Sequence, residues 1–83
     1  MQSDVDFILG ILEENGQATN QELLAASYVQ RGYGLTVHSR IADARKRLPE
    51  HERISCERVG ESQHRRPVYL YRLVRDAGQL GLL

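Results

Sequence analysis

Hydrophobic residues recur at helical spacing in the first part of the chain. The apolar positions at its start follow one another at intervals of 3, 1 and 3 residues, which is typical of one buried helix face: Val5, Ile8, Leu9 and Leu12. Ser3 followed by Asp6 has the spacing of a capping box, and Asn15-Gly16 is typical of a helix end. The pattern therefore predicts a first helix between these two signals.

A second helix is predicted by the same kind of signal. Thr19-Asn20-Gln21-Glu22 repeats the capping-box spacing, and the good helix formers of 23–26 follow it. We expect this helix to run from about residue 20 to residue 30. The connection at 31–35 holds two glycines, and the sequence leaves open a very short strand at Leu35.

The stretch 36–48 is apolar on one narrow side only. Its apolar positions recur at i, i+4, i+7 and i+11: Val37, Ile41, Ala44 and Leu48. Thr36 is a good N-cap residue, and Gly34 allows the chain to turn in before it. The other sides are almost all polar and include His38, Ser39, Arg40, Asp43, Arg45, Lys46 and Arg47. The pattern predicts a third helix with one face in the core and a cationic face toward water or a partner.

From Arg53 onward the hydrophobic period changes from helical to alternating. Ile54 and Cys56 share one side of an extended segment, and Tyr69, Tyr71 and Leu73 share one side of another. The polar segment 60–67 separates the two. The pattern predicts a β-hairpin with an exposed tip, and it places Cys56 inward, as a small buried hydrophobe.

Composition indicates one small domain, which we place at 1–75, with a C-terminal tail at 76–83. The chain has 83 residues, 41% of them hydrophobic and 27% charged, which is ordinary for a folded protein. Its formal net charge of zero hides a separation. Residues 1–35 hold one basic and five acidic residues, whereas 36–75 hold ten basic and five acidic residues. The domain should therefore be electrically two-sided.

Cysteine content and hydropathy favour a cytoplasmic protein. A single cysteine, Cys56, excludes an internal disulfide, and no apolar run reaches the roughly 18–20 residues of a membrane span. The amino terminus shows no basic region followed by an apolar one, so no secretory signal is visible.

The order of these elements resembles the winged helix-turn-helix family of DNA-binding domains over residues 4–75. The resemblance is closest to small phage-, prophage- and plasmid-type proteins, in which a helix like 36–43 precedes a basic turn and a strand like Tyr71-Arg72-Leu73. The resemblance implies an α+β fold, with three helices followed by a two-stranded antiparallel β-hairpin wing.

The resemblance also implies where duplex DNA would bind. The helix at 36–48 would enter the major groove, and the wing at 60–67 would lie on the backbone or in the minor groove. Arginine pairs with guanine, so Arg40 is our candidate for base readout, while Asp43 accepts from cytosine or orients a neighbouring arginine. The predicted contact residues are Thr36, His38, Ser39, Arg40, Asp43, Arg45, Lys46, His64, Arg65 and Arg66.

Several of these residues have a simpler interpretation. The charges of Arg65 and Arg66 could simply protect an exposed hairpin from pairing with another chain. Arg72 and Arg75 are expected to pair with Glu57 or nearby acids across the strands. Aromatic residues beside a turn, here Tyr28 and Tyr33, are usually in a core or at its edge.

Catalytic and metal chemistry is not indicated. The separations of His51, Cys56 and His64 match no familiar zinc ligand pair, and a structural zinc site normally needs four ligands. No phosphate-binding glycine loop or paired-carboxylate motif is present. We therefore expect neither a cofactor nor enzymatic activity.

The leading hypothesis is a non-enzymatic, sequence-specific DNA-binding protein. It would act as a transcriptional regulator or as an accessory factor in phage replication or excision. A homodimer or a protein partner could use the acidic N-terminal half or the apolar tail Leu80-Gly81-Leu82-Leu83. The alternative is a winged-helix module that binds another protein and not DNA.

Overall fold

The computed structural model describes residues 2–75, which form three helices and one three-stranded antiparallel sheet. In chain order the elements are α1 (Asp4–Asn15), β1 (Gln17–Thr19), α2 (Asn20–Arg31), α3 (Val37–Arg47), β2 (Glu52–Glu61) and β3 (Pro67–Arg75). The fold is therefore α+β. The tail at 76–83, and any interface made by its leucines, lies outside the described residues.

Both predicted helix starts are confirmed. The Ser3 hydroxyl accepts a hydrogen bond from the Asp6 backbone N–H at 3.1 Å, and Gly16 ends α1 in the left-handed conformation with φ 81°. At α2, the Thr19 hydroxyl accepts from the Glu22 N–H while the Glu22 carboxylate accepts from the Thr19 N–H. Each helix is therefore started by side chains that lie within one turn of it.

The predicted hairpin is present, but the third strand is not at Leu35. It is β1, which pairs with β3 and gives the strand order β1-β3-β2. Leu35 is a buried loop residue, and its N–H is donated to the Ser27 hydroxyl and not to a strand. The hairpin strands are also longer than expected, so that the connection between them is only 62–66.

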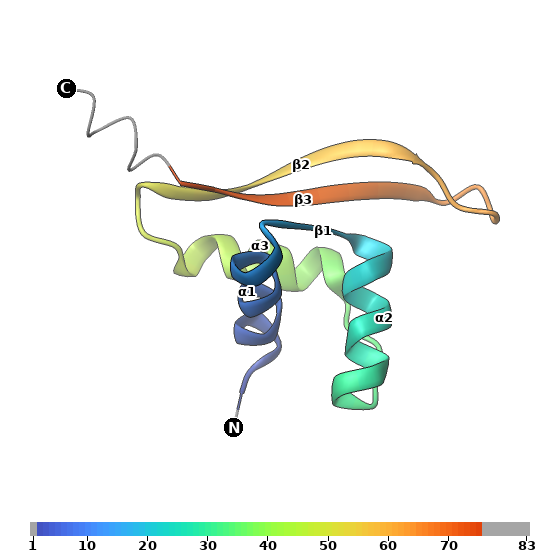
Figure 1. The fold of residues 1–83 in the computed structure, drawn as a ribbon, viewed down its shortest axis with the longest axis horizontal. Helices are drawn as coiled ribbons and strands as arrows, with labels where there is room; N and C mark the ends of the chain where they lie inside the picture. Colours follow the sequence, from blue (N-terminus) through green and yellow to red (C-terminus); the bar gives the residue numbers. More distant parts are fainter. Residues whose placement is uncertain (1, 76–83) are drawn as a thin grey trace.

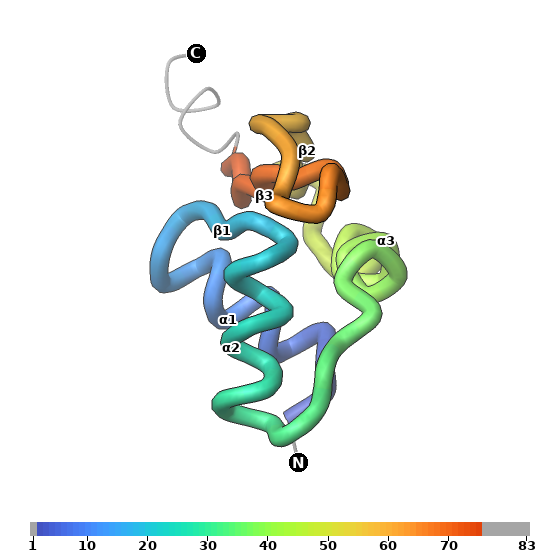
Figure 2. Tube along the Cα trace, turned by 90° about the vertical axis from the view of Figure 1, so that its right-hand side faces the viewer, coloured from blue at the N-terminus to red at the C-terminus, as the bar shows by residue number. Residues whose placement is uncertain are grey.

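The three helices lie against one face of the sheet. In Figure 1 the β2–β3 hairpin runs across the ends of α1 and α2, and its tip extends beyond α2. Figure 2 shows α3 almost end-on, to one side of α1 and α2 and next to the hairpin. The buried hydrophobic core between these layers consists of Val5, Phe7, Ile8, Leu12, Ala18, Leu23, Leu35, Ile41, Ala44, Ile54 and Tyr71.

Tyr28 and Tyr33 are not at the edge of this core. Their exposed fractions are 60% and 44%, and Val29 beside them is 84% exposed. The Tyr33 hydroxyl donates to the Asp4 carboxylate at 2.5 Å and accepts from Arg31 at 3.0 Å, which holds that ring at the surface. The prediction for these two tyrosines was therefore wrong.

Ser27 is the buried polar residue of the core, and it connects α2 to the loop before α3. Its hydroxyl donates to the Leu24 carbonyl at 2.6 Å and accepts from the Leu35 N–H at 3.2 Å. A buried N–H without an acceptor is costly, so this one hydroxyl fixes the part of the connection that lies just before α3.

Replacing Ser27 with alanine is expected to destabilise the domain by about 1–3 kcal/mol, because the Leu35 N–H then has no acceptor. Urea unfolding followed by circular dichroism measures this change. The control is Ser62→Ala, whose hydroxyl lies in the hairpin turn outside the core. Equal stability of Ser27→Ala and the parent protein would show that the loop finds another acceptor.

Candidate nucleic-acid interface

Helix α3 has one buried side and one exposed side, as its sequence predicted. Ile41 and Ala44 are 1% and 0% exposed, and Val37 and Leu48 pack against the same core. The helix ends one residue short of the expected 36–48 range on each side. Thr36 occupies the N-cap position, but its side chain makes no capping hydrogen bond, so the expected cap is not formed.

The centre of the exposed side of α3 carries Ser39, Ala42 and Lys46, all of them exposed. Among residues 2–75, no carboxylate pairs with Lys46. The middle of this helix face is therefore open. The side chains of Ser39 and Ala42 are small, so another molecule can approach the helix closely there.

The edge of α3 that lies toward α1 is occupied by ion pairs. Arg40 is 3.2 Å from Asp43 on the next turn, and Arg47 is 2.8 Å from Asp6 of α1. A hydrogen bond with Ser3, followed by the charge of Arg47, holds the pKa of Asp6 below its ordinary value. Arg47 thus ties α3 to α1, whereas the Arg40–Asp43 pair has the geometry expected of an aspartate that orients an arginine.

The opposite edge of α3 is tied to the sheet by Arg45. Its guanidinium donates from Nε at 3.2 Å and from Nη2 at 3.1 Å to the backbone carbonyl of Ile54 in β2. Arg45 is one of the predicted DNA-contact residues, and in the structure these two bonds hold its guanidinium on the protein backbone. Arg45 therefore fixes the spacing between α3 and the hairpin.

The hairpin tip, defined here as 62–66, is an ordered turn. The Ser62 N–H donates to the Arg66 carbonyl at 2.8 Å, and the Ser62 hydroxyl accepts from the N–H groups of His64 and Arg66. Arg65 has φ 59°, a conformation that non-glycine residues seldom adopt. These bonds leave the side chains of His64, Arg65 and Arg66 exposed.

Asn20 holds the base of the hairpin against the start of α2. Its amide nitrogen donates to the Pro67 carbonyl at 3.4 Å, and its amide oxygen accepts from the Tyr69 N–H at 3.1 Å. This pair of bonds continues the backbone pairing of β1 with β3, which ends at Thr19 and Leu70. The hairpin tip therefore has a defined position relative to α2.

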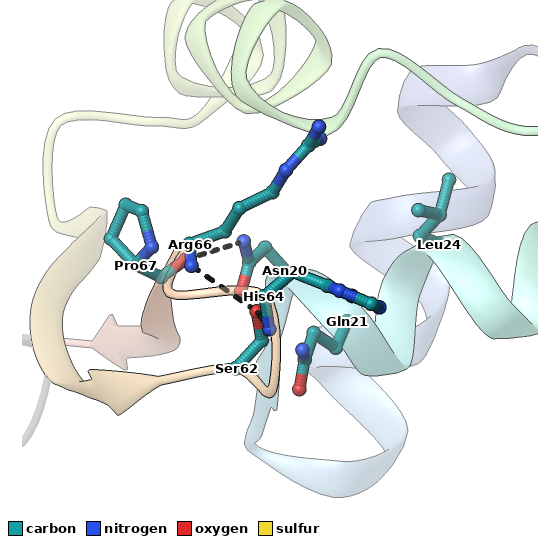
Figure 3. A pocket seen from close by; sticks show the side chains of 7 residues that line it. All are labelled: Asn20, Gln21, Leu24, Ser62, His64, Arg66 and Pro67. Atoms are coloured by element: carbon teal, nitrogen blue, oxygen red, sulfur yellow. Dashed lines mark hydrogen bonds between the residues drawn. The ribbon is translucent and has the colours of Figure 1, made fainter.

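A groove between α2 and the hairpin tip results from this connection. Figure 3 shows its lining side chains and the Arg66 side chain reaching from the turn toward the start of α3. A second groove lies between α3 and the hairpin, and Arg66 lines it as well. The further residues of the second groove are Asn20, Val37, His38, Cys56, Pro67, Tyr69 and Tyr71. His38 of α3 and Arg66 of the hairpin tip thus border one surface depression.

Cys56 is exposed in this second groove, so its predicted burial is wrong. Cys56 is paired in register with the buried Tyr71. Its own side chain lines the groove between α3 and the hairpin instead of packing in the core. Burial, and then the neighbouring thiol of Cys56, raise the pKa of the Tyr71 phenol, which therefore stays neutral.

Most arginines outside the hairpin tip are paired. Arg75 pairs with Glu52 across the strands at 2.9 Å, as expected, and also with Glu13 at 2.6 Å, while Arg72 donates to Gln17 and not to Glu57. The pairs of Arg47 and Arg75 join the basic part of the sequence to its acidic part, which reduces the predicted separation of charge. Among residues 2–75, the Lys and Arg side chains of α3 and the hairpin tip that have neither an ion pair nor a side-chain hydrogen bond are Lys46, Arg65 and Arg66, because Arg45 bonds the Ile54 carbonyl.

On the hypothesis of DNA binding, replacing Asn20 with alanine is expected to weaken the affinity several-fold, because the hairpin tip loses its connection to α2 and must be ordered on binding. Fluorescence anisotropy with duplex DNA measures the affinity, and amide exchange of β3 reports the loosening. Gln21→Ala, at the next residue of α2, is the matched control. Unchanged affinity together with faster exchange at Tyr69 would separate hairpin order from binding.

Within the described part of the chain, no group of three or more His, Cys, Asp and Glu side chains could hold a metal ion. None of the helices described is long and apolar enough to cross a membrane. Comparison of the chain with protein-family models, with curated proteins and with solved structures found no match in any of the three.

Sequence reasoning missed Asn20 and Ser27 as positioning residues. Asn20 was interpreted only as part of a capping box, because its backbone partners lie 47 and 49 residues further along the chain. Ser27 had a weak signal, which is a single polar residue on the buried side of a helix.

Proposed function

We propose that this chain is a non-enzymatic, sequence-specific DNA-binding protein of the winged helix-turn-helix type. In this proposal α3 enters the major groove, and the hairpin tip lies on the phosphate backbone or in the minor groove. The sheet order β1-β3-β2 and the position of α3 beside the hairpin support this assignment. A cytoplasmic role as a transcriptional regulator or as a phage replication or excision factor is consistent with it.

The observation that carries the proposal is the position of the unpaired cations. Lys46 lies on the exposed side of α3, and Arg65 and Arg66 lie on the tip of the neighbouring hairpin. Arg66 and His38 line one groove between the two elements. A duplex presents phosphates on both sides of the major groove, so a helix in the groove and a flanking cationic turn match its charge pattern.

The side chains of α3 suggest how bases would be read. Arg40 is half-exposed and held by Asp43 at 3.2 Å, so it can be presented to the O6 and N7 atoms of guanine with little loss of conformational freedom. Ser39 lies next to it and can bond a base or a phosphate. Lys46 is assigned to a phosphate, and Arg45 is assigned to holding β2.

An NMR titration of the labelled chain with short duplex DNA of random sequence tests the proposal. We expect shifts to concentrate in 37–47 and 62–66, and we expect the affinity to fall steeply between about 50 and 200 mM salt. Shifts confined to α1 and α2, or an affinity that does not depend on salt, would contradict the proposal. Lys46→Ala should weaken binding to all sequences alike, whereas Arg40→Ala should also change the preferred sequence.

A protein-binding module is the second candidate, and the exposed residues of α2 favour it. Tyr28 is 60% exposed and Val29 is 84% exposed. Both belong to α2 and not to α3 or the hairpin tip, which carry the unpaired cations. A module of this kind would keep its partner affinity when Arg65 and Arg66 are removed and would show no affinity for duplex DNA. The titration above therefore distinguishes the two candidates.

A further inference from the structure

The groove between α3 and the hairpin combines apolar and basic side chains. Its apolar and aromatic lining residues are Val37, Pro67, Tyr69 and Tyr71. Its basic side chains are His38 and Arg66, and none of the described residues that line it is acidic. Resting on the proposed function, we propose that this groove holds the sugar–phosphate backbone of one DNA strand, with a phosphate at Arg66 and His38 and a deoxyribose against the apolar lining.

The location of the groove agrees with the geometry of a duplex. In B-DNA the major and minor grooves are neighbours, and a single sugar–phosphate strand separates them. The proposed function places α3 in the major groove, and the hairpin lies next to α3 (Figure 2). With the hairpin tip in the neighbouring minor groove, the strand that separates the two has to pass between α3 and the hairpin, which is where the depression lies.

The two kinds of lining match the two parts of a strand. Arginine binds phosphate oxygens by charge-assisted hydrogen bonds, and the Arg66 side chain, unpaired among residues 2–75, reaches toward the start of α3 (Figure 3). A deoxyribose between two phosphates exposes mainly C–H groups, which favour an apolar surface. A free phosphate ion would leave the apolar lining unused, and an apolar peptide would leave Arg66 unpaired. A nucleic-acid strand uses both.

The groove has a small volume, and both of its sides are held in place. Its volume is about 390 Å³, near the lower end of the range of about 300–1,000 Å³ for ligand sites, so it can hold a short piece of one strand. Arg45 holds β2 beside α3 through the Ile54 carbonyl, and Asn20 holds β3 at the start of α2. The two sides are therefore positioned before DNA arrives, which lowers the entropic cost of binding.

Cys56 reports whether the groove is occupied, because it is the single cysteine of the chain and is exposed there. Its rate of alkylation by N-ethylmaleimide is measured on the full chain; this reagent is neutral, so phosphates do not repel it. With duplex DNA at about ten times the dissociation constant, we expect alkylation to be about tenfold slower, because only unbound chains react. An unchanged rate on chains that fluorescence anisotropy shows to be bound overturns the proposal and leaves the proposed function standing.

The matched control exchanges two neighbouring residues of β2. In the variant Ser55→Cys with Cys56→Ser, the thiol lies one position away on the strand and therefore on the opposite face of the sheet. Its alkylation should be equally fast with and without duplex DNA. Equal slowing in this variant would mean that DNA shields the hairpin as a whole, and that outcome also overturns the proposal.

Arg65 and Arg66 provide a second matched pair. Arg66 lines the groove, whereas Arg65 is not among its described lining residues. At the same saturation with DNA, Arg66→Ala should lose most of the protection of Cys56, and Arg65→Ala should keep it although it loses the same charge. Equal protection in the two variants overturns the phosphate position at Arg66. A parent chain without affinity for duplex DNA at about 50 mM salt overturns the proposed function itself, which is a different result from a bound chain with a reactive thiol.

Discussion

Replacing Arg65 and Arg66 together with alanine is expected to weaken binding to duplex DNA about a hundredfold. Neither side chain has an ion pair within the described residues, and the turn that carries them is fixed by four hydrogen bonds in which Ser62 donates or accepts. A hydrogen bond to a charged group contributes about 1.5–3 kcal/mol, so two lost phosphate contacts account for this change. The salt slope should fall by about two as well.

Fluorescence anisotropy at several salt concentrations measures both quantities. The matched control is the double change Arg72→Ala with Arg75→Ala, which removes the same charge from β3, away from the hairpin tip. Arg75 is paired with Glu13 and Glu52, and Arg72 donates to Gln17, so neither is available to a phosphate. Equal loss of affinity in the two double variants would show that net charge alone governs binding and that the tip makes no contact.

The parts of the fold that the sequence predicted well depend on neighbouring residues. The starts of α1 and α2 were predicted from Ser3 and Thr19 because a cap is formed within one helical turn. The buried side of α3 was predicted from the spacing of Ile41 and Ala44 for the same reason. Local chemistry is sufficient where both partners of an interaction lie on one element.

The third strand was not predicted because its partner is distant. β1 has only three residues, and Gln17 pairs with Arg72, which is 55 residues further along the chain. Nothing in a three-residue pattern distinguishes such a strand from a turn, whereas the apolar Leu35 after two glycines suggested a strand. Leu35 is apolar because it is buried in the core, and its backbone bonds to a side chain instead of a strand.

The sequence predicted which residue types the candidate site would contain, but it did not predict which of them form hydrogen bonds or ion pairs with the rest of the protein. Alternation placed Cys56 on the same side of its strand as Ile54, but it does not reveal whether another layer covers that side at Cys56. The count of basic residues likewise gave no indication that Arg45 would bond a carbonyl or that Arg47 would pair with Asp6. Only the fold shows which cations remain available to a partner.

The paired residues and the unpaired ones have complementary roles in this arrangement. Arg45 connects α3 to β2, and Asn20 connects α2 to the base of the hairpin. Both connections fix α3 and the hairpin tip relative to each other before a partner binds. Rigid placement of this kind lowers the entropic cost of binding, so the few free cations can act together.

Replacing Ile41 with alanine is expected to destabilise the domain by about 2–5 kcal/mol, because the side chain is 1% exposed and anchors α3 to the core. A chain of this length has a total stability of about 4–12 kcal/mol, so the variant should unfold at a clearly lower temperature. Thermal and urea unfolding followed by circular dichroism measure the loss.

Lys46→Ala on the same helix is the control, and we expect it to change the affinity for DNA and not the stability. Lysine at this position is exposed and alanine is the better helix former, so stability should stay the same or rise slightly, while affinity for duplex DNA falls. Below its unfolding temperature, Ile41→Ala should bind DNA within a few-fold of the parent. A stability loss under about 1 kcal/mol for Ile41→Ala would contradict the packing of α3 on this face. Loss of DNA binding by folded Ile41→Ala would show that the orientation of α3 depends on this anchor as strongly as its stability does.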